Sequence, residues 1–495
     1  MAMNALDRLI GPLAGAVERQ KDRVIVRDEK QLLSHMDALI REAVFGEAAG
    51  KAAARWLIWE TAQALGIRPA SIHELYTARG RGEIARTFTV PAVNLRMLAY
   101  DSARAVFRAA REIDAGAFIF EIARSEISYT DQRPPEYVSA VLAAAIREGF
   151  RGPVFIQGDH FQAAAKKYTA DPEAELKAIR ELIVESVSAG FLNIDIDTST
   201  LVDIAKPTLA EQQKSNFELC AGLTRFIRTQ EPNGVTISIG GEIGEVGQKN
   251  SSLEDLEAFM RGFDALRGPV TGISKISVQT GTSHGGVVLP DGTLARVAID
   301  FNVLKELSEE ARAKYGMGGA VQHGASTLPD SAFHKFVEAG ACEVHLATAF
   351  QSLVIDHEAT PEALRREIYE WLKINVAGER KPKDTEAQFL YKARKKAVGP
   401  FKKQFWTLPQ AALAAIGASL EKKFAFLFEQ LAIGGTTVIV AKQVQAPEVH
   451  QPLPEGGVKM AKGQGGVDEG AGGLMDATER SRPASADRKS LRNNG

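Results

Sequence analysis

The spacing of apolar residues along the 495-residue chain changes its period near residue 86. Before that point, apolar positions recur every three or four residues, as in Leu32, Met36 and Leu39, which is the pattern of amphipathic helices. From Thr87 onward, short β-rich runs alternate with helical stretches, which is typical of βα units and a parallel sheet. We therefore predict an N-terminal helical extension over residues 1–85, followed by an α/β domain.

Eight β-rich runs follow one another in this second part of the chain. They are TFTVPAVN (87–94), AFIFEIA (117–123), PVFIQ (153–157), LNIDID (192–197), VTISIGG (235–241), ISKISVQTG (273–281), GGAVQHG (318–324) and CEVHLAT (342–348). Eight parallel strands with helices between them predict a closed (β/α)8 TIM barrel. The barrel would occupy residues 86–358, close to the ~250 residues typical of this architecture.

The chain after the barrel divides into a helical part and a polar tail. The segment TPEALRREIYEWLK begins with Thr-Pro and has helical periodicity, and a second helical block runs from Leu408 to Leu431. These blocks predict C-terminal helices within residues 359–444. Beyond Val444 the sequence is rich in Gly, Pro, Ser and charge, so we expect a disordered tail over 445–495 that is dispensable for folding.

Composition and charge narrow the class of protein. Hydrophobic residues at 45%, charged residues at 25% and a formal net charge of -2 are typical of a soluble protein and do not favour a nucleic-acid partner. The N-terminal segment differs from a secretory signal, and no apolar run approaches the ~20 residues that cross a bilayer. Two cysteines, Cys220 and Cys342, form no disulfide framework, so we expect a cytoplasmic protein without a membrane partner.

Candidate chemistry gathers at the carboxyl ends of the predicted strands, where barrel enzymes place their reactive groups. Three of the nine histidines, His160, His284 and His323, follow strands three, six and seven. Three imidazoles from separate strands suit Zn²⁺ and leave a fourth coordination position open for substrate. The alternative is three unrelated polar residues at the rim.

Carboxylates accompany the histidines. Asp159 adjoins His160 and would either take part in the reaction or hydrogen-bond the metal ligands; we favour proton transfer. Asp197 and Glu242, at the ends of strands four and five, would hold a second cation or orient the histidines, unless they are simply solvated.

Small and hydroxyl-bearing residues follow strands six to eight, where such barrels often bind phosphate through backbone N–H groups. They are Gly285, Gly324, Ala325, Ser326 and Thr348. A phosphorylated ligand is the functional interpretation, and tight turns are the structural one.

Seven segments, in order, resemble the metal-dependent class II fructose-bisphosphate and tagatose-bisphosphate aldolases. They are VPAVNL, GPVFIQGDH, SAGFLNIDIDTST, GGEIGEVG, ISKISVQTGTSHGG, VQHGASTLPD and AGACEVHLAT, spread over residues 87–350. The resemblance implies a zinc-dependent lyase that cleaves a ketose 1,6-bisphosphate, foremost fructose 1,6-bisphosphate, and that forms a homodimer or larger homo-oligomer.

The resemblance also assigns roles to residues. Zn²⁺ would bind His160, His284 and His323, with Asp159 handling the proton of the C4 hydroxyl group and with Asp197 and Glu242 around a second cation position. Gly285, Gly324 and Ser326 would cradle phosphate. Ser199 belongs to the Asp-x-Ser pattern, and Asn94 ends the first strand in a substrate-binding position.

Departures from the family pattern keep alternatives open. The acidic residue of the mobile loop after strand five would be Glu254 or Asp255, the substrate-contacting Asn of strand eight aligns with His345, and an aspartate two residues later aligns with Ala347. A non-catalytic barrel subunit of a ketose-bisphosphate aldolase is therefore the second hypothesis, and a tagatose-bisphosphate aldolase stays open as the alternative enzyme. A metal-dependent hydrolase ranks third because strand one lacks His-x-His, and Lys275 lies at the wrong end of its strand for a Schiff base.

Overall fold

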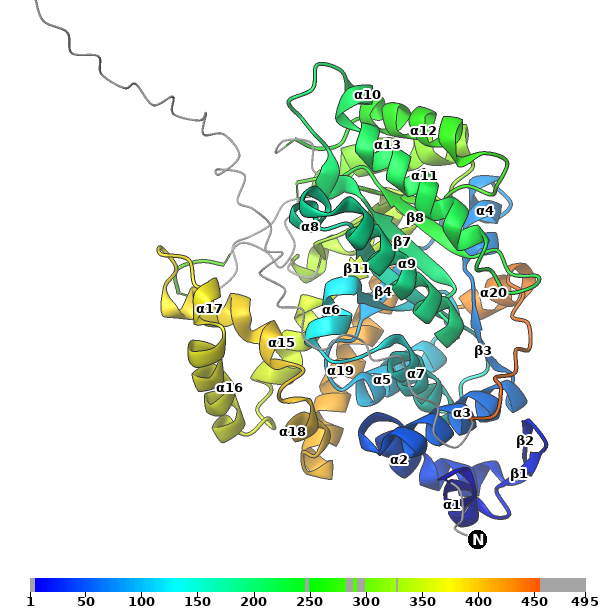
Figure 1. Ribbon diagram of the computed structural model, residues 1–495. Helices are drawn as coiled ribbons and strands as arrows, with labels where there is room; N and C mark the ends of the chain where they lie inside the picture. The colour runs from blue at the N-terminus through cyan, green and yellow to red at the C-terminus, as the bar shows by residue number, and fades with distance from the viewer. Residues whose placement is uncertain (1–4, 245–248, 282–287, 292–298, 326–327, 455–495) are drawn as a thin grey trace, which may run out of the picture. The chain divides into compact units, whose positions relative to one another are not determined.

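The computed structural model describes residues 5–244, 249–281, 288–291, 299–325 and 328–454 (Figure 1). Within these residues, eight parallel strands close into a barrel, because β4 pairs with β5 on one side and with β11 on the other. The strands are β4 (Val90–Asn94), β5 (Ile119–Ala123), β6 (Gly152–Gln162), β7 (Asn193–Asp197), β8 (Ser238–Glu242), β9 (Lys275–Val278), β10 (Ala320–Gln322) and β11 (Glu343–Leu346). The predicted (β/α)8 barrel is confirmed.

Helices cover the outside of the barrel (Figure 1). They are α5 (Ala99–Glu112), α6 (Arg124–Tyr129), α7 (Pro134–Arg147), α8 (Ala165–Ala170), α9 (Pro172–Ala189), α10 (Leu209–Gln212), α11 (Lys214–Arg228), α12 (Leu253–Arg267), α13 (Phe301–Tyr315), α14 (His334–Glu338) and α15 (Thr348–Asp356). Their ends follow local rules: in α9, the Asp171 side chain accepts from the Ala174 N–H, and Gly190 ends the helix at φ 109°. Strands β4, β5 and β7 are buried at every residue, and burial on both faces explains the largely apolar runs of β4 and β5.

The N-terminal extension contains strands as well as the predicted helices. Its elements are α1 (Ala5–Ile10), β1 (Val17–Gln20), β2 (Arg23–Val26), α2 (Glu29–Phe45), α3 (Ala48–Ala64), β3 (Ile67–Ala70) and α4 (His73–Gly80). Strand β3 pairs in parallel with the start of β6. The buried Arg79 of α4 donates to the backbone carbonyls of Phe88, Gly340 and Ala341, which precede β4 and β11. The extension therefore closes the amino-terminal end of the barrel.

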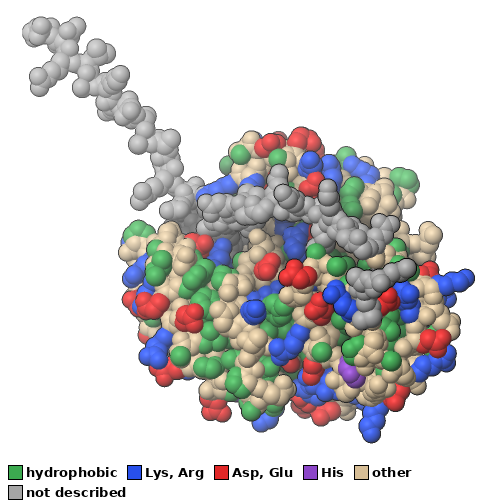
Figure 2. Space-filling model, turned by 60° about the horizontal axis from the view of Figure 1, so that its bottom comes forward, with side chains coloured by type: hydrophobic (Ala, Val, Ile, Leu, Met, Phe, Trp, Pro, Cys, Tyr) green, Lys and Arg blue, Asp and Glu red, His purple; other side chains and the backbone are tan. Residues whose placement is uncertain are grey.

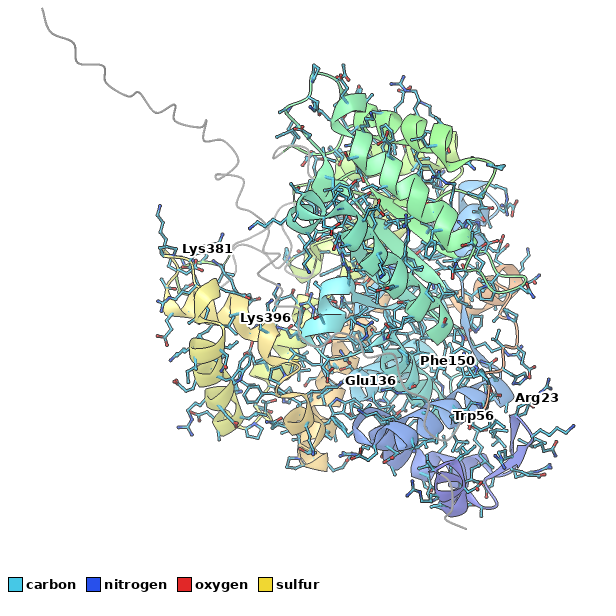
Figure 3. All side chains as sticks on the ribbon, viewed as in Figure 1. Arg23, Trp56, Glu136, Phe150, Lys381 and Lys396 are labelled. Carbon is cyan, nitrogen blue, oxygen red and sulfur yellow. The ribbon has the colours of Figure 1, made fainter. Side chains whose placement is uncertain are left out.

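C-terminal helices pack beside the barrel, as the sequence predicts. They are α16 (Glu362–Asn375), α17 (Glu386–Ala393), α18 (Lys402–Trp406), α19 (Gln410–Gln430) and α20 (Thr436–Gln443), with the short helix η6 (Arg394–Ala397) after α17. Helix α19 lies along α5, and the Thr89 N–H donates to the Leu431 carbonyl at 3.0 Å, next to the first barrel strand. Lys402 of α18 pairs with Glu136 of α7, which is labelled in Figure 3.

The start of the predicted disordered tail has a defined place in the structure. Residues 445–454 form no helix or strand, but they lie against the N-terminal extension. The indole N–H groups of Trp56 and Trp59 on α3 donate to the carbonyls of Gln451 and Val449 at 3.0 Å and 2.7 Å, and Trp56 is labelled in Figure 3. The prediction of disorder is wrong for this segment, and residues 455–495 lie outside the described part of the chain.

Charged side chains of both signs are interspersed over the described residues on the face that Figure 2 shows. Among the helices that the structure describes, none combines the length and the apolar character needed to cross a bilayer.

Candidate active site

A β-bulge in strand β6 builds the centre of the candidate site. Gly158 pairs with Ile194 of β7, but Phe161 pairs with Ile196, so β6 carries one extra residue between these pairs. His160 takes a left-handed backbone conformation at φ 40°, which is uncommon for a residue other than glycine and concentrates at functional sites. The bulge brings Asp159 and His160 to the same site, although neighbouring residues of a regular strand point to opposite faces.

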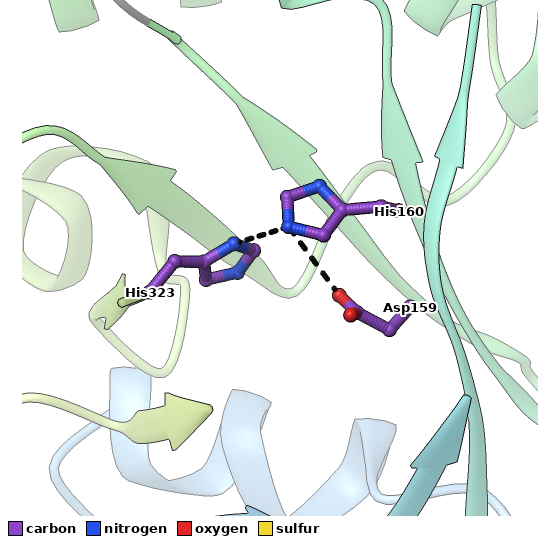
Figure 4. Close-up of side chains that lie close together, drawn as sticks. All are labelled: Asp159, His160 and His323. Carbon is purple, nitrogen blue, oxygen red and sulfur yellow. Dashed lines mark hydrogen bonds and ion pairs between the residues drawn. The ribbon is translucent and has the colours of Figure 1, made fainter. Parts of the chain in front are cut away.

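Two imidazole rings face each other at the carboxyl end of the barrel (Figure 4). His160 Nε2 lies 2.7 Å from Nδ1 of His323, which follows β10, and 3.8 Å from Asp159 Oδ1. The ligand atoms of Asp159, His160 and His323 lie within 4.8 Å of one another.

The other nitrogen of each ring is held by a neighbour. His160 Nδ1 lies 3.1 Å from Asp197 Oδ2 and 3.4 Å from Glu242 Oε2, and His323 Nε2 lies 3.2 Å from Ser277 Oγ. A carboxylate that holds one nitrogen of a histidine aims the second nitrogen at a metal and makes it a better ligand. His160, Asp197 and Glu242 form a second compact group of possible ligands.

The electrostatics of the site favour positive charge. Burial alone would lower the pKa of His160, but the carboxylates of Asp159, Glu242 and Asp197 raise it well above its usual value. Burial and the charge of Asp197 raise the pKa of Glu242 to about 7. Burial would raise the pKa of Asp197, yet His160 holds it below its ordinary value. A buried site with this excess of acidic groups suits a cation.

The donor set fits Zn²⁺. Imidazole nitrogens are among its usual ligands, and both histidines present one nitrogen to a common point. His284, the third predicted ligand, lies outside the described residues, as do Gly285 and Ser326 of the predicted phosphate cradle.

The structure places the remaining predicted residues around this centre. Ser199 Oγ donates to Asp197 Oδ1 at 2.6 Å, and Asn94 Nδ2 donates to Glu126 Oε2 at 2.6 Å. Gly324, at φ 72°, and the buried Ala325 directly follow His323, and Thr348 begins α15 after β11. His345 lies beneath Asp159, with its Nδ1 3.3 Å from Asp159 Oδ1.

The two candidates for the loop acid begin helix α12 instead. The Ser252 side chain accepts from the Asp255 N–H, and Asp255 Oδ2 accepts from the Ser252 N–H, so the Asp255 carboxylate is used in a capping box with Ser252. A hydrogen bond from its own backbone N–H, and after it one from the Ser252 side chain, lower the pKa of the exposed Glu254. Neither carboxylate belongs to the groups of possible ligands described above.

Sequence reasoning missed two cations at the rim. Arg96 follows β4 by two residues and pairs with Glu126 at 2.6 Å; burial would lower its pKa, but Glu126 and, less strongly, Asp159 raise it. Lys395 of η6 stays accessible to solvent, yet the surrounding protein and the charge of Arg96 lower the pKa of its ammonium group. Arg96 carried a detectable signal as a charged residue just past a strand end, whereas Lys395 lies about 300 residues away in the helical region.

Comparison with known proteins decides the family. The model of the class II fructose-bisphosphate aldolases matches residues 83–407, which is more than half of the chain. The protein belongs to the class II fructose-bisphosphate aldolase family. This membership bears out the resemblance read from the seven sequence segments.

Solved structures that are similar to this class II aldolase family member have low sequence identity to it. A fructuronate–tagaturonate epimerase from Cohnella laeviribosi is 12% identical, with 86% of this chain and 90% of that chain covered and a TM-score of 0.52. A putative fructose-1,6-bisphosphate aldolase from Coccidioides immitis is 19% identical over 73% of this chain and 96% of that chain, with a TM-score of 0.40. A fructose-bisphosphate aldolase from Campylobacter jejuni is 17% identical over 73% and 93%, with a TM-score of 0.43.

Proposed function

We propose that the protein is a zinc-dependent aldolase that reversibly cleaves fructose 1,6-bisphosphate to dihydroxyacetone phosphate and glyceraldehyde 3-phosphate. The observation that carries the proposal is the convergence of Asp159, His160 and His323 at the carboxyl end of the barrel of a class II aldolase. The convergence supplies a carboxylate for proton transfer beside nitrogen ligands for a metal.

His160 and His323 would hold the ion, with His284 as the third ligand that the family resemblance implies. When bound there, Zn²⁺ supplies Lewis-acid chemistry, since it polarises the ketose carbonyl and stabilises the negative charge left by cleavage. Asp197 would keep His160 oriented through Nδ1, and Glu242 would join it around a second cation position.

Asp159 would act as the base. It accepts the proton of the C4 hydroxyl group, the C3–C4 bond breaks, and the C4 oxygen becomes the aldehyde oxygen of glyceraldehyde 3-phosphate. The bonding electron pair stays with the three-carbon fragment, which takes up one proton at C3 and gives dihydroxyacetone phosphate. The protons balance, because the one removed by Asp159 equals the one added at C3.

Cations and backbone N–H groups would bind the two phosphates. Gly324 and Ala325 lie next to His323, with Gly285, Ser326 and Thr348 as the further residues proposed for one phosphate cradle. Arg96 and Lys395 supply positive charge at the rim for the second phosphate.

A coupled aldol-cleavage assay on fructose 1,6-bisphosphate and tagatose 1,6-bisphosphate tests the proposal. We expect cleavage of the fructose compound that a chelator abolishes and added Zn²⁺ restores. Faster cleavage of tagatose 1,6-bisphosphate would show that this sugar is the preferred substrate. The proposed type of reaction, aldol cleavage, would still stand. Cleavage of neither by a zinc-loaded protein would favour the non-catalytic subunit.

A further inference from the structure

A network of ionisable groups fills the barrel interior beneath Asp159. The side chains of Lys275 and Glu343 are fully buried, and His345, Asp195 and Glu121 are nearly so. They come from β9, β11, β7 and β5, so their spacing is fixed by the strands of the barrel.

Lys275 anchors the lower part of this network. Its Nζ lies 2.5 Å from Glu343 Oε1, 2.7 Å from Gln157 Oε1 and 3.0 Å from Asp195 Oδ2. Burial alone would lower the pKa of Lys275, but Asp195 and Glu343 raise it. Lys275 is therefore a charged anchor for three oxygen atoms and is unsuited to form a Schiff base, as the sequence predicts.

His345 joins this anchor to Asp159. Its Nε2 lies 2.6 Å from Glu343 Oε1, while its Nδ1 lies 3.3 Å from Asp159 Oδ1 and 2.9 Å from Glu121 Oε2. Burial would lower the pKa of His345, but Glu121, Asp159 and Glu343 raise it well above its usual value. One ring therefore contacts the anchored carboxylate below it and the proposed base above it.

The N-terminal extension adds the last member of the network, at the amino-terminal end of the barrel. The hydroxyl group of Tyr76 on α4 donates to Glu343 Oε2 at 2.5 Å, so both oxygens of Glu343 are engaged. The contacts run from Tyr76 through Glu343 and His345 to Asp159.

Stability alone gives little reason for this arrangement. Removing several charges from water costs about as much as their attraction returns, and an apolar core of similar volume is often as stable. An ionic network at the centre of a barrel instead fixes the orientation of its members, which a base needs when the reacting proton must lie within hydrogen-bond reach.

We propose that His345 is a positioning residue that holds the Asp159 carboxylate, and that Lys275, Glu343 and Tyr76 fix His345 from below. The inference rests on the proposed aldolase function. It links the N-terminal extension to the proposed base, because Tyr76 of α4 donates to Glu343, which in turn contacts His345.

Two substitutions of His345 separate its two contacts. His345→Asn keeps a polar group near the position of Nδ1, beside Asp159, whereas His345→Gln keeps one near the position of Nε2, beside Glu343. We expect zinc content to stay at the wild-type level in both variants. We expect kcat to fall at least 100-fold in the Gln variant and less than 10-fold in the Asn variant, with KM within threefold of wild type. Equal kcat values for the two variants, or a loss confined to KM, would overturn the proposal.

A pair of tyrosine variants tests the contact between Tyr76 and Glu343. Tyr76→Phe should lower kcat several-fold with KM unchanged, because it releases one oxygen of Glu343. The matched control is Tyr100→Phe, which removes another largely buried hydroxyl group that donates to a carboxylate, Asp37, at 2.6 Å on the outside of the barrel. The same kcat for both Phe variants would argue against an effect of Tyr76 on Asp159 through Glu343 and His345.

Crystal structures of the zinc-loaded His345 variants make the test independent of the reaction. The Asp159 carboxylate should keep its wild-type orientation in the Asn variant and rotate away in the Gln variant. An unmoved Asp159 in the Gln variant would refute the positioning role. A wild type that cleaves no ketose bisphosphate would refute the proposed function, while the two crystal structures would still decide the role of His345.

Discussion

The ring of His160 meets the ring of His323 edge-on, with an interplanar angle of 87° and 2.7 Å between Nε2 of the first and Nδ1 of the second. The two residues are 163 positions apart in the chain: His160 lies in the bulged part of β6, and His323 directly follows β10. Their outer nitrogens are engaged by Asp197 and Ser277, so the facing nitrogens define the point where a metal would bind.

The contact between Asp197 and His160 predicts a loss of metal affinity on substitution. Asp197→Asn should weaken zinc binding about 10–100-fold, since it removes the carboxylate that orients the imidazole. Zinc affinity is measured by competition with a chromophoric chelator. The control is Asp203→Asn, which changes an exposed carboxylate paired only with Lys206 at 3.8 Å among the ion pairs described. Equal affinities of the two variants would show that Asp197 does not support the metal site.

Asp159 and His160 should separate proton transfer from metal binding. Asp159→Asn should retain zinc and lose at least roughly 100-fold in kcat, the range associated with general acid–base catalysis. His160→Ala should lose zinc itself. Zinc content and cleavage rate are measured on the same preparations. Wild-type turnover by Asp159→Asn would show that Asp159 is not the base.

The segment 445–454 should contribute to stability. Truncation after Val444 removes its hydrogen bonds to Trp56, Trp59 and Arg68 and should lower the free energy of unfolding by about 1–3 kcal/mol. Truncation after Pro454 removes none of these contacts and serves as the matched control. Urea unfolding of both truncated chains gives the comparison, and identical midpoints would show that the segment adds nothing.

His73 at the start of α4 should make stability fall in mild acid. Burial lowers its pKa from 6.5 to about 4 in the folded protein. The unfolded chain therefore binds the proton more tightly, so the stability contributed by neutral His73 is present above pH 6.5 and is lost as the pH falls toward 4.

A pair of histidine variants isolates this effect. Between pH 7 and pH 5, wild type should lose about 2 kcal/mol more unfolding free energy than His73→Gln. His334→Gln, which replaces an exposed histidine, is measured alongside as the control for the substitution itself. If the unfolding free energy of His73→Gln changes with pH as it does in wild type, His73 is not the group responsible.

The barrel could be predicted because its strands are buried on both faces and leave apolar runs in the sequence. Strand β3 was missed because IRPA is short, contains a proline and gains its partner, the start of β6, only in the folded protein. Residues 445–454 were missed because their contacts are mainly backbone hydrogen bonds to side chains of α3 and β3, which composition does not reveal.

The candidate site was predicted in part for a similar reason. Polar residues that end strands are visible in the sequence, so Asp159, His160 and His323 could be placed at one rim. The bulge that brings Asp159 and His160 together depends on pairing with β7, and the approach of Lys395 to Arg96 depends on how the C-terminal helices pack. Neither relationship can be recognised from the sequence around the residues concerned.

The most direct test of the central claim is the rate of fructose 1,6-bisphosphate cleavage by one preparation before chelation, after chelation and after addition of Zn²⁺. We predict cleavage by the metal-loaded protein, loss of activity on chelation and recovery when about one Zn²⁺ per chain is bound, consistent with a single site of histidine ligands. Full activity in the chelated protein, or no cleavage by the zinc-loaded protein, would contradict a zinc-dependent fructose-bisphosphate aldolase.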